Sequence, residues 1–189
     1  MVGLRAVATV FALLLLAGCA EDAADGPRSQ SSPGASEPGP ASPLAGVAER
    51  FVGLGTTSKT GPRWARQVSV YVGGEKARTL VAAEAADQRS WRLCPPSAAE
   101  YAMRKCPVSP FRAMDLLAED AGMPVYEDRV PTNVGCDTVA VLPDGVRSSS
   151  SITIRPDRHH RDCFSDFAIT LYVDAEQRVS AVSFTLSSP

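Results

Sequence analysis

Four cysteines between residues 94 and 163 constrain the fold of this chain more than any other feature. They are Cys94, Cys106, Cys136 and Cys163, and a fifth, Cys19, stands apart near the N-terminus. An even number of cysteines in an exported chain predicts two disulfides. Four cysteines allow three different pairings. We expect Cys94–Cys106 and Cys136–Cys163, because cysteines that are neighbours in the sequence meet at the smallest loop-closure cost.

A metal site is the alternative use of these cysteines. His159 and His160 lie close to Cys163 in the sequence and could join it as ligands. However, the chain has no C-x-x-C pair, and adjacent residues of an extended segment point to opposite faces. We therefore expect disulfides, and we expect neither a metal nor a cofactor.

The N-terminal segment has the pattern of an export signal. Arg5 precedes an apolar run over residues 7–17. A membrane-spanning helix needs about 20 residues, so this run is too short to cross a bilayer and fits a signal peptide instead. The run closes with Leu-Ala-Gly-Cys at 16–19, and in this it resembles bacterial lipoprotein precursors. The alternative is a soluble secreted protein in which Cys19 lies near the cleavage site by chance.

The resemblance to lipoprotein precursors implies that residues 1–18 are removed and that Cys19 becomes a lipid-modified N-terminus. The family carries a diacylglyceryl thioether and an N-acyl chain, such as palmitate, at this cysteine. More than one acyl chain holds a protein stably at a membrane. We therefore expect a cell-membrane location on the extracytoplasmic side, with the membrane and an unknown envelope protein or ligand as partners.

A composition break separates a tether from one folded domain. Residues 20–43 hold 13 Pro, Gly or Ser among 24 positions and no apolar residue larger than Ala. Such a segment cannot bury enough surface to fold, so we expect a disordered tether over 19–43. The expected globular domain, 44–189, carries 17 basic and 17 acidic residues. A neutral domain argues against nucleic-acid binding, which needs a basic face.

Two amphipathic helices are expected. The first has Ser42 at its N-cap, Pro43 in its first turn, and Gly53 and Gly55 at its end. Its apolar stripe comprises Leu44, Val47, Ala48, Phe51 and Val52.

The second helix begins at Ser109 and Pro110 and ends before Gly122 and Pro124. Its expected buried face comprises Phe111, Met114, Leu117, Ala118 and Ala121.

Alternating apolar residues predict at least four strands. Strands are expected at 68–72, at 76–80 after a Gly73-Gly74 turn, at 138–142, around 152–154, and at 167–173 and 182–186 joined by a turn at 174–177. Val179 and Ala181 are out of phase with Val182, so we expect a bulge near Ser180. The expected fold is α+β: a mostly antiparallel sheet of four or more strands with two helices, cross-linked by two disulfides.

Catalytic motifs are missing from the sequence, which has no G-x-S-x-G, H-E-x-x-H, P-loop or EF-hand pattern. A polar run contains Asp157, His159, His160 and Asp162. A histidine oriented by a carboxylate could act there as the general base of a hydrolase. The alternative, which we favour, is a solvated loop between two strands. We assign no catalytic residue.

Four large aromatic residues are candidates for a binding surface, because Trp and Tyr are enriched at such surfaces. They are Trp64, Tyr71, Trp91 and Tyr101. The alternative is that these rings pack in the core.

The cysteine order also looks like that of the bacterial subtilisin-inhibitor-like family. Here Leu-Cys-Pro-Pro at 93–96 is followed by Cys106 before a helix, and then by Cys136 and Cys163. The family has two sequential disulfides on an antiparallel sheet with helices. Its protease-binding bond lies two residues after the third cysteine, which implies the peptide bond between Thr138 and Val139. This chain differs by an extra N-terminal helix, a long insertion before Cys136 and a 26-residue tail after Cys163.

These observations favour a membrane-anchored cell-envelope lipoprotein that is a non-enzymatic binding or accessory module. The alternatives are an envelope hydrolase that uses the loop with His159 and His160, and a subtilisin-inhibitor-like protease inhibitor.

Overall fold

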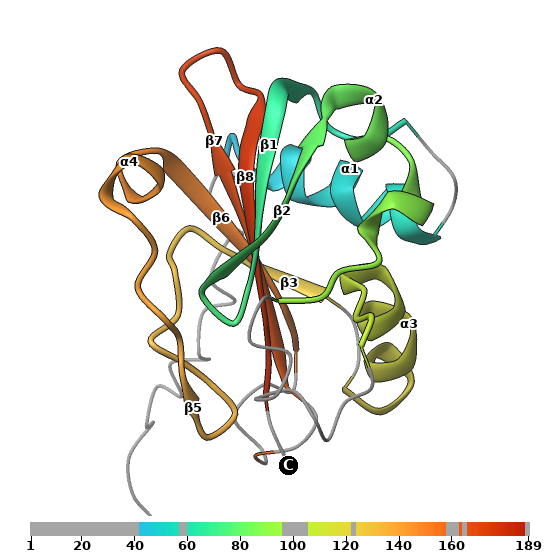
Figure 1. The fold of residues 1–189 in the computed structure, drawn as a ribbon. Helices are drawn as coiled ribbons and strands as arrows, with labels where there is room; N and C mark the ends of the chain where they lie inside the picture. The colour runs from blue at the N-terminus through green and yellow to red at the C-terminus, as the bar shows by residue number, and fades with distance from the viewer. Residues whose placement is uncertain are drawn as a thin grey trace, which may run out of the picture. The chain divides into compact units, whose positions relative to one another are not determined.

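A mixed six-stranded sheet with the strand order β2-β1-β8-β7-β6-β3 forms the centre of the fold (Figure 1). The computed structural model describes residues 42–56, 60–95, 106–121, 124–157, 163 and 166–187, except for the side chains of 116–121. The strands are β1 (Trp64–Val72), β2 (Glu75–Val81), β3 (Pro124–Glu127), β6 (Ser150–Pro156), β7 (Phe167–Val173) and β8 (Val179–Leu186). Neighbouring strands are antiparallel except β1 and β8, which are parallel. The prediction of a mostly antiparallel sheet is confirmed.

The helices are of two sizes. Two helices of 12 residues, α1 (Ala45–Thr56) and α3 (Pro110–Ala121), lie where the sequence predicts helices. Three short helices have no counterpart in the prediction: α2 (Ala82–Ala85), the 3-10 helix η1 (Gln88–Trp91) and α4 (Asp144–Arg147). In the described part of the chain, no helix has the length and apolar character needed to cross a membrane.

Helices α1 and α3 cover one face of the sheet and form the main core with it (Figure 1). Ser42 caps α1 as predicted, because its Oγ accepts a hydrogen bond from the Leu44 amide at 3.2 Å. Buried side chains of this core include Val47, Ala48, Phe51 and Leu54 from α1 and Phe111, Ala113 and Met114 from α3. Val52, which the stripe places with them, is only partly buried. Leu117, Ala118 and Ala121, also predicted to be buried, lie outside the described side chains.

The end of α1 differs from the prediction. The helix continues through Gly53 and Gly55 to Thr56, so these glycines do not terminate it. Gly55 has a packing role instead: a Cβ atom at this position would lie 2.5 Å from Cδ1 of Phe111. The Phe111 ring is 1% exposed and stacks on Phe51, with a centroid distance of 4.9 Å. Gly55 therefore permits the close approach of α1 and α3.

The sheet carries several features that the sequence predicts. Gly73 and Gly74 connect β1 to β2 with φ of 57° and 88°, the left-handed conformation of a type I′ hairpin turn. At the other hairpin, Val173 pairs with Val179 and Tyr172 pairs with Ala181, which leaves Ser180 as an extra residue. The predicted bulge at Ser180 is confirmed.

One strand prediction is wrong, and one strand of the main sheet was not predicted. Of the expected strand at 138–142, only Thr138 belongs to a strand: β5 (Asp137–Thr138), which pairs with β4 (Asn133–Val134) in a separate two-stranded sheet. Residues 139–143 have no regular structure. Pro124, expected as a residue beyond the second helix, is the first residue of β3 at the edge of the main sheet, where a missing amide hydrogen is tolerated. Gly122 lies outside the described residues.

The second face of the sheet is covered by an irregular segment, residues 128–147, that includes β4, β5 and α4. Its apolar contact with the sheet is a small cluster in which Leu142 packs with Tyr71, Tyr172 and Ala181. The rest of this face is buried and polar. The Thr153 hydroxyl, for example, lies 2.9 Å from the Thr170 hydroxyl and donates a 2.8 Å bond to the Arg129 carbonyl.

The packing of α1 against α3 predicts opposite effects for two glycine substitutions in the same helix. Gly55→Ala lowers the free energy of unfolding by about 1–3 kcal/mol, because the buried Phe111 ring cannot move away. Gly46→Ala raises it by up to about 1 kcal/mol, because its Cβ would meet only Arg50 Nη1 at 3.5 Å and alanine favours helix. Urea denaturation measures both. Equal effects at the two positions would contradict the proposed close approach.

Candidate functional site

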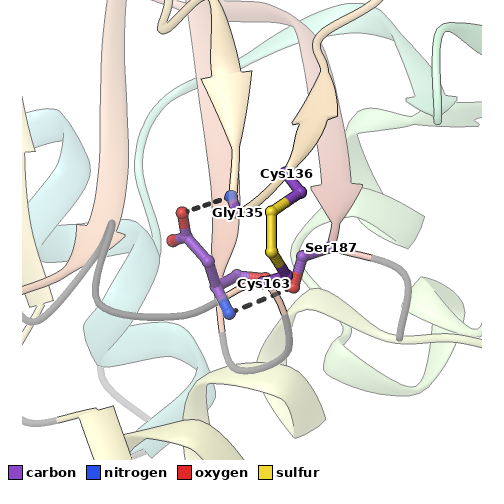
Figure 2. Close-up of a disulfide and its surroundings, with 5 residues drawn as sticks. Gly135, Cys136, Cys163 and Ser187 are labelled. Atoms are coloured by element: carbon purple, nitrogen blue, oxygen red, sulfur yellow. Dashed lines mark hydrogen bonds between the residues drawn. A yellow bond between two sulfur atoms is a disulfide. The ribbon is translucent and has the colours of Figure 1, made fainter.

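The disulfide pairing predicted from the sequence is confirmed. Cys94 and Cys106 are bonded, with 5.6 Å between their Cα atoms. Cys136 and Cys163 are bonded, with 4.9 Å between their Cα atoms. The second disulfide ties the turn between β4 and β5 to the segment that leads into β7 (Figure 2). It therefore fixes the covering segment to the sheet.

The polar loop is only partly described. Asp157 is exposed just after the end of β6. His159, His160 and Asp162 lie outside the described residues, so this candidate site stays a prediction. Across the described ranges, no group of three or more His, Cys, Asp or Glu side chains could hold a metal ion.

The candidate binding aromatics are largely core residues. Trp91 is completely buried and Tyr71 is 6% exposed, so the prediction that they present a binding surface is wrong. Trp91 lies against Phe51, with a centroid distance of 5.4 Å, and its indole donates a 3.0 Å bond to the Ala85 carbonyl. Trp64 is partly buried in the same ring cluster, 5.7 Å from Trp91. Tyr101 lies outside the described residues. The rings pack here because large apolar surfaces are stabilised by burial.

A buried ion pair lies beside the Cys136–Cys163 disulfide. Nη2 of Arg155, on β6, lies 2.6 Å from Oδ2 of Asp166, and both side chains are only 2% exposed. The same Oδ2 accepts a 2.7 Å bond from the Gly135 amide. Asp166 is held in turn by Ser187, whose hydroxyl donates to the Asp166 carbonyl at 3.0 Å. This network joins β6, the strand ends of β7 and β8, and the β4–β5 turn. Figure 2 shows Gly135 and Ser187 of this network beside the Cys136–Cys163 disulfide.

Gly135 is the residue that permits this arrangement. Its φ is 56°, and a Cβ atom would lie 2.7 Å from Cβ of Ser187 and 3.0 Å from the Cys163 carbonyl oxygen. Only glycine therefore lets the turn approach the disulfide and donate its amide to Asp166.

The chain that follows this turn, residues 137–143, carries both exposed and buried side chains, and we call it the presented segment. Thr138 and Ala140 are exposed, and Val141 is 77% exposed, the highest value among the exposed large apolar side chains. Val139 donates its amide to the Thr132 carbonyl at 2.9 Å. The next residue, Leu142, is 4% exposed and packs on the sheet. A Cβ atom at Gly74 would collide with Cβ of Ala140, so the segment also packs against the β1–β2 turn. The presented segment is thus fixed on both sides of Val141, whose side chain is exposed.

Two tyrosines support the far end of the presented segment. Leu142 packs against Tyr71 and Tyr172, which come from β1 and β7. Burial raises the pKa of the Tyr172 phenol, and the nearby Tyr71 phenol adds to this rise. Tyr172 is therefore protonated and neutral near pH 7, as a buried side chain in this cluster requires.

A cavity of 170 Å³ lies between β3 and the covering segment. Its wall includes Glu127, Arg129, Asn133 and the buried Arg155. The two arginines face carboxylates, since Arg129 pairs with Glu127 at 3.5 Å and Arg155 pairs with Asp166. The cavity is therefore close to electrically neutral and offers no excess charge to a ligand.

Comparison of the chain with protein families, with curated proteins and with solved structures gives no match. The geometry described above therefore carries the functional assignment by itself.

Several residues of this site escaped the sequence analysis. Arg155 and Asp166 are separated by a polar run and look like ordinary solvated charges. Val141 alternates with Val139, a pattern typical of a strand. The one available signal was Gly135 directly before Cys136, a glycine beside a cysteine in a chain with two disulfides.

The buried ion pair predicts that removal of the Asp166 charge lowers the free energy of unfolding by a large amount. Asp166→Asn keeps the shape of the side chain and an oxygen for the Gly135 amide but removes the carboxylate charge that pairs with the buried Arg155. We expect a loss of about 3–5 kcal/mol in the free energy of unfolding. The double variant Arg155→Met/Asp166→Asn recovers part of this loss because the buried arginine charge is removed together with the carboxylate charge.

Asp144→Asn provides the control, because Asp144 pairs with Arg147 at the surface, where the two side chains are 89% and 53% exposed. This change costs less than about 1 kcal/mol. Urea denaturation measures all three variants. An Asp166→Asn loss no larger than that of the control would refute the role of the buried pair.

Proposed function

We propose that this chain is a lipid-anchored protein of the cell envelope whose folded domain is a non-enzymatic binding module. It binds a partner protein through the presented segment, residues 137–143. The observation that carries the proposal is the exposure of Val141 between two fixed points, the Cys136–Cys163 disulfide and the buried Leu142.

The design of the presented segment suits protein recognition. A loop that is held in one conformation before binding loses little conformational entropy when a partner docks. An apolar side chain at its centre gains free energy by burial in a partner's pocket. A second exposed valine, Val130 at 41%, belongs to the same covering segment.

The anchoring part of the proposal depends on the export pattern at residues 7–17 and on Leu-Ala-Gly-Cys at 16–19. Two disulfides in the domain fit an oxidising compartment outside the cytoplasm. An acylated Cys19 followed by the 24 residues 20–43 would let the domain stand roughly 27 Å from the membrane surface as a flexible coil.

The anchor predicts a specific mass for the mature protein. Mass spectrometry of the full chain from its native cell is expected to give an N-terminal Cys19 with attached acyl chains. Cys19→Ala is expected to abolish the modification and to shift the protein out of the membrane fraction. An unmodified N-terminus, or unchanged fractionation of Cys19→Ala, would refute the anchor and leave the binding proposal standing.

The presented segment predicts position-specific crosslinking. A photoreactive amino acid placed at Val141 of the full chain in its native cell is expected to yield a defined covalent adduct with one envelope protein. The matched control is Val81, which is 49% exposed on the edge strand β2. An adduct at both positions, or none at Val141, would argue against a partner at this segment.

A second candidate function has one observation in its favour. The peptide bond between Thr138 and Val139, implied by the subtilisin-inhibitor-like cysteine order, lies in the presented segment, and Thr138 is exposed. In that case the partner crosslinked at Val141 is a serine protease that the chain inhibits, and Thr138→Pro abolishes the inhibition. A partner without protease activity excludes this candidate.

A further inference from the structure

A second surface, distant in sequence from the presented segment, has an unusual collection of charges. A cleft of 580 Å³ lies between η1 and the first turns of α3, two elements that contact each other. Its wall includes Gln88, Arg89, Arg92, Ser109, Arg112 and Asp115. We call it the arginine cleft.

The three arginines of this cleft are exposed and lack ion pairs. The side chains of Arg89, Arg92 and Arg112 form no salt bridge or hydrogen bond within the described ranges. Five other arginines of the domain each pair with a carboxylate: Arg78, Arg129, Arg147, Arg155 and Arg178. Arg50, Arg63 and Arg66 also form no salt bridge among the described residues, but they do not line this cleft. Among its described residues, the wall of the cleft has three arginines and one acidic residue, Asp115. These side chains together carry an excess of two positive charges.

The backbone that carries these arginines is well supported. The Asp87 carboxylate accepts a 3.0 Å bond from the Arg89 amide and so caps η1. Leu93 and Val108 exchange two backbone bonds of 2.8 Å, which join the two walls of the cleft. The Cys94–Cys106 disulfide reinforces this junction. Like charges therefore remain close together on a rigid frame rather than spreading apart.

We propose that the arginine cleft binds a ligand through a phosphate ester group. Guanidinium groups form paired hydrogen bonds with phosphate oxygens, and several of them together neutralise the charge of a phosphate ester. A phosphate ester has more oxygen atoms than a carboxylate, so it can accept hydrogen bonds from more than one arginine at the same time. Ser109 and Gln88 add neutral hydrogen-bonding groups at the rim. The volume of 580 Å³ is within the range of sites for small organic ligands, about 300–1,000 Å³, so the cleft has room for more than the phosphate group itself.

Two sources can supply this group: a soluble phosphate ester and the headgroup of an anionic phospholipid. The two share the chemistry that the cleft recognises, and they differ in whether a membrane must be present. Glycerol 3-phosphate represents the first source, and vesicles of phosphatidylglycerol represent the second.

The test compares two triple variants of the full chain with equal changes in charge. Arg89→Gln/Arg92→Gln/Arg112→Gln removes the cleft charges. The control, Arg50→Gln/Arg63→Gln/Arg66→Gln, removes three exposed charges from α1, β1 and the residue before β1. All proteins also carry Cys19→Ala, so that no acyl chain contributes to vesicle binding. Circular dichroism verifies that each variant is folded.

Calorimetric titration with glycerol 3-phosphate and co-sedimentation with phosphatidylglycerol or phosphatidylcholine vesicles form the two arms. In at least one arm we expect binding that falls about tenfold or more in the cleft variant and stays within about twofold in the control. Calorimetric binding identifies a soluble ester. A preference for phosphatidylglycerol over phosphatidylcholine without calorimetric binding identifies a headgroup. Absence of binding in both arms, or equal losses in the two triple variants, would overturn the proposal.

Discussion

The central strands of this sheet are buried on both faces, and the remaining structure follows from that constraint. All seven residues of β7 are buried, as are six of the eight in β8. Two covering layers are therefore necessary. On one face, the backbone groups of α1 and α3 form hydrogen bonds within each helix. Apolar contacts of their side chains are therefore enough to cover this face. On the other face the cover is an irregular segment, and different interactions hold it.

An irregular cover brings unpaired backbone groups against a sheet, and each of these needs a hydrogen-bond partner. Buried polar residues in β6 and just before β7 meet this need. Thr153 bonds the Arg129 carbonyl, and Asp166 bonds the Gly135 amide. The Asp166 carboxylate is itself compensated by Arg155, because an isolated buried charge would be strongly unfavourable. The buried polar residues thus attach the covering segment, residues 128–147, to the sheet. This attachment holds the presented segment in place.

Local patterns in the sequence were sufficient for features that depend on neighbouring residues. The phase change between Val179 and Val182 predicted the bulge at Ser180, and loop-closure cost predicted both disulfide pairings. The same reliance on local patterns gave a wrong prediction for the presented segment. The presented segment alternates like a strand, and only its position outside the sheet exposes Val141.

Long-range features left no local pattern to find. The parallel pairing of β1 with β8 joins strands more than a hundred residues apart in the sequence. Gly55 looks like a helix terminator until Phe111 is known to lie against it. The arginine cleft also depends on a long-range contact. Arg89 and Arg112 line the same cleft because the Leu93–Val108 bridge places η1 beside α3.

Each disulfide lies beside one of the two surfaces to which we assign binding, and local stability explains this placement. Segments with few buried apolar contacts open more easily than the core. The presented segment has one main apolar contact with the sheet, through Leu142, and the arginine cleft concentrates like charges that repel. A covalent bond at the base of each surface limits such opening without filling the surface with apolar side chains. The disulfides Cys136–Cys163 and Cys94–Cys106 therefore hold the two exposed surfaces in fixed conformations.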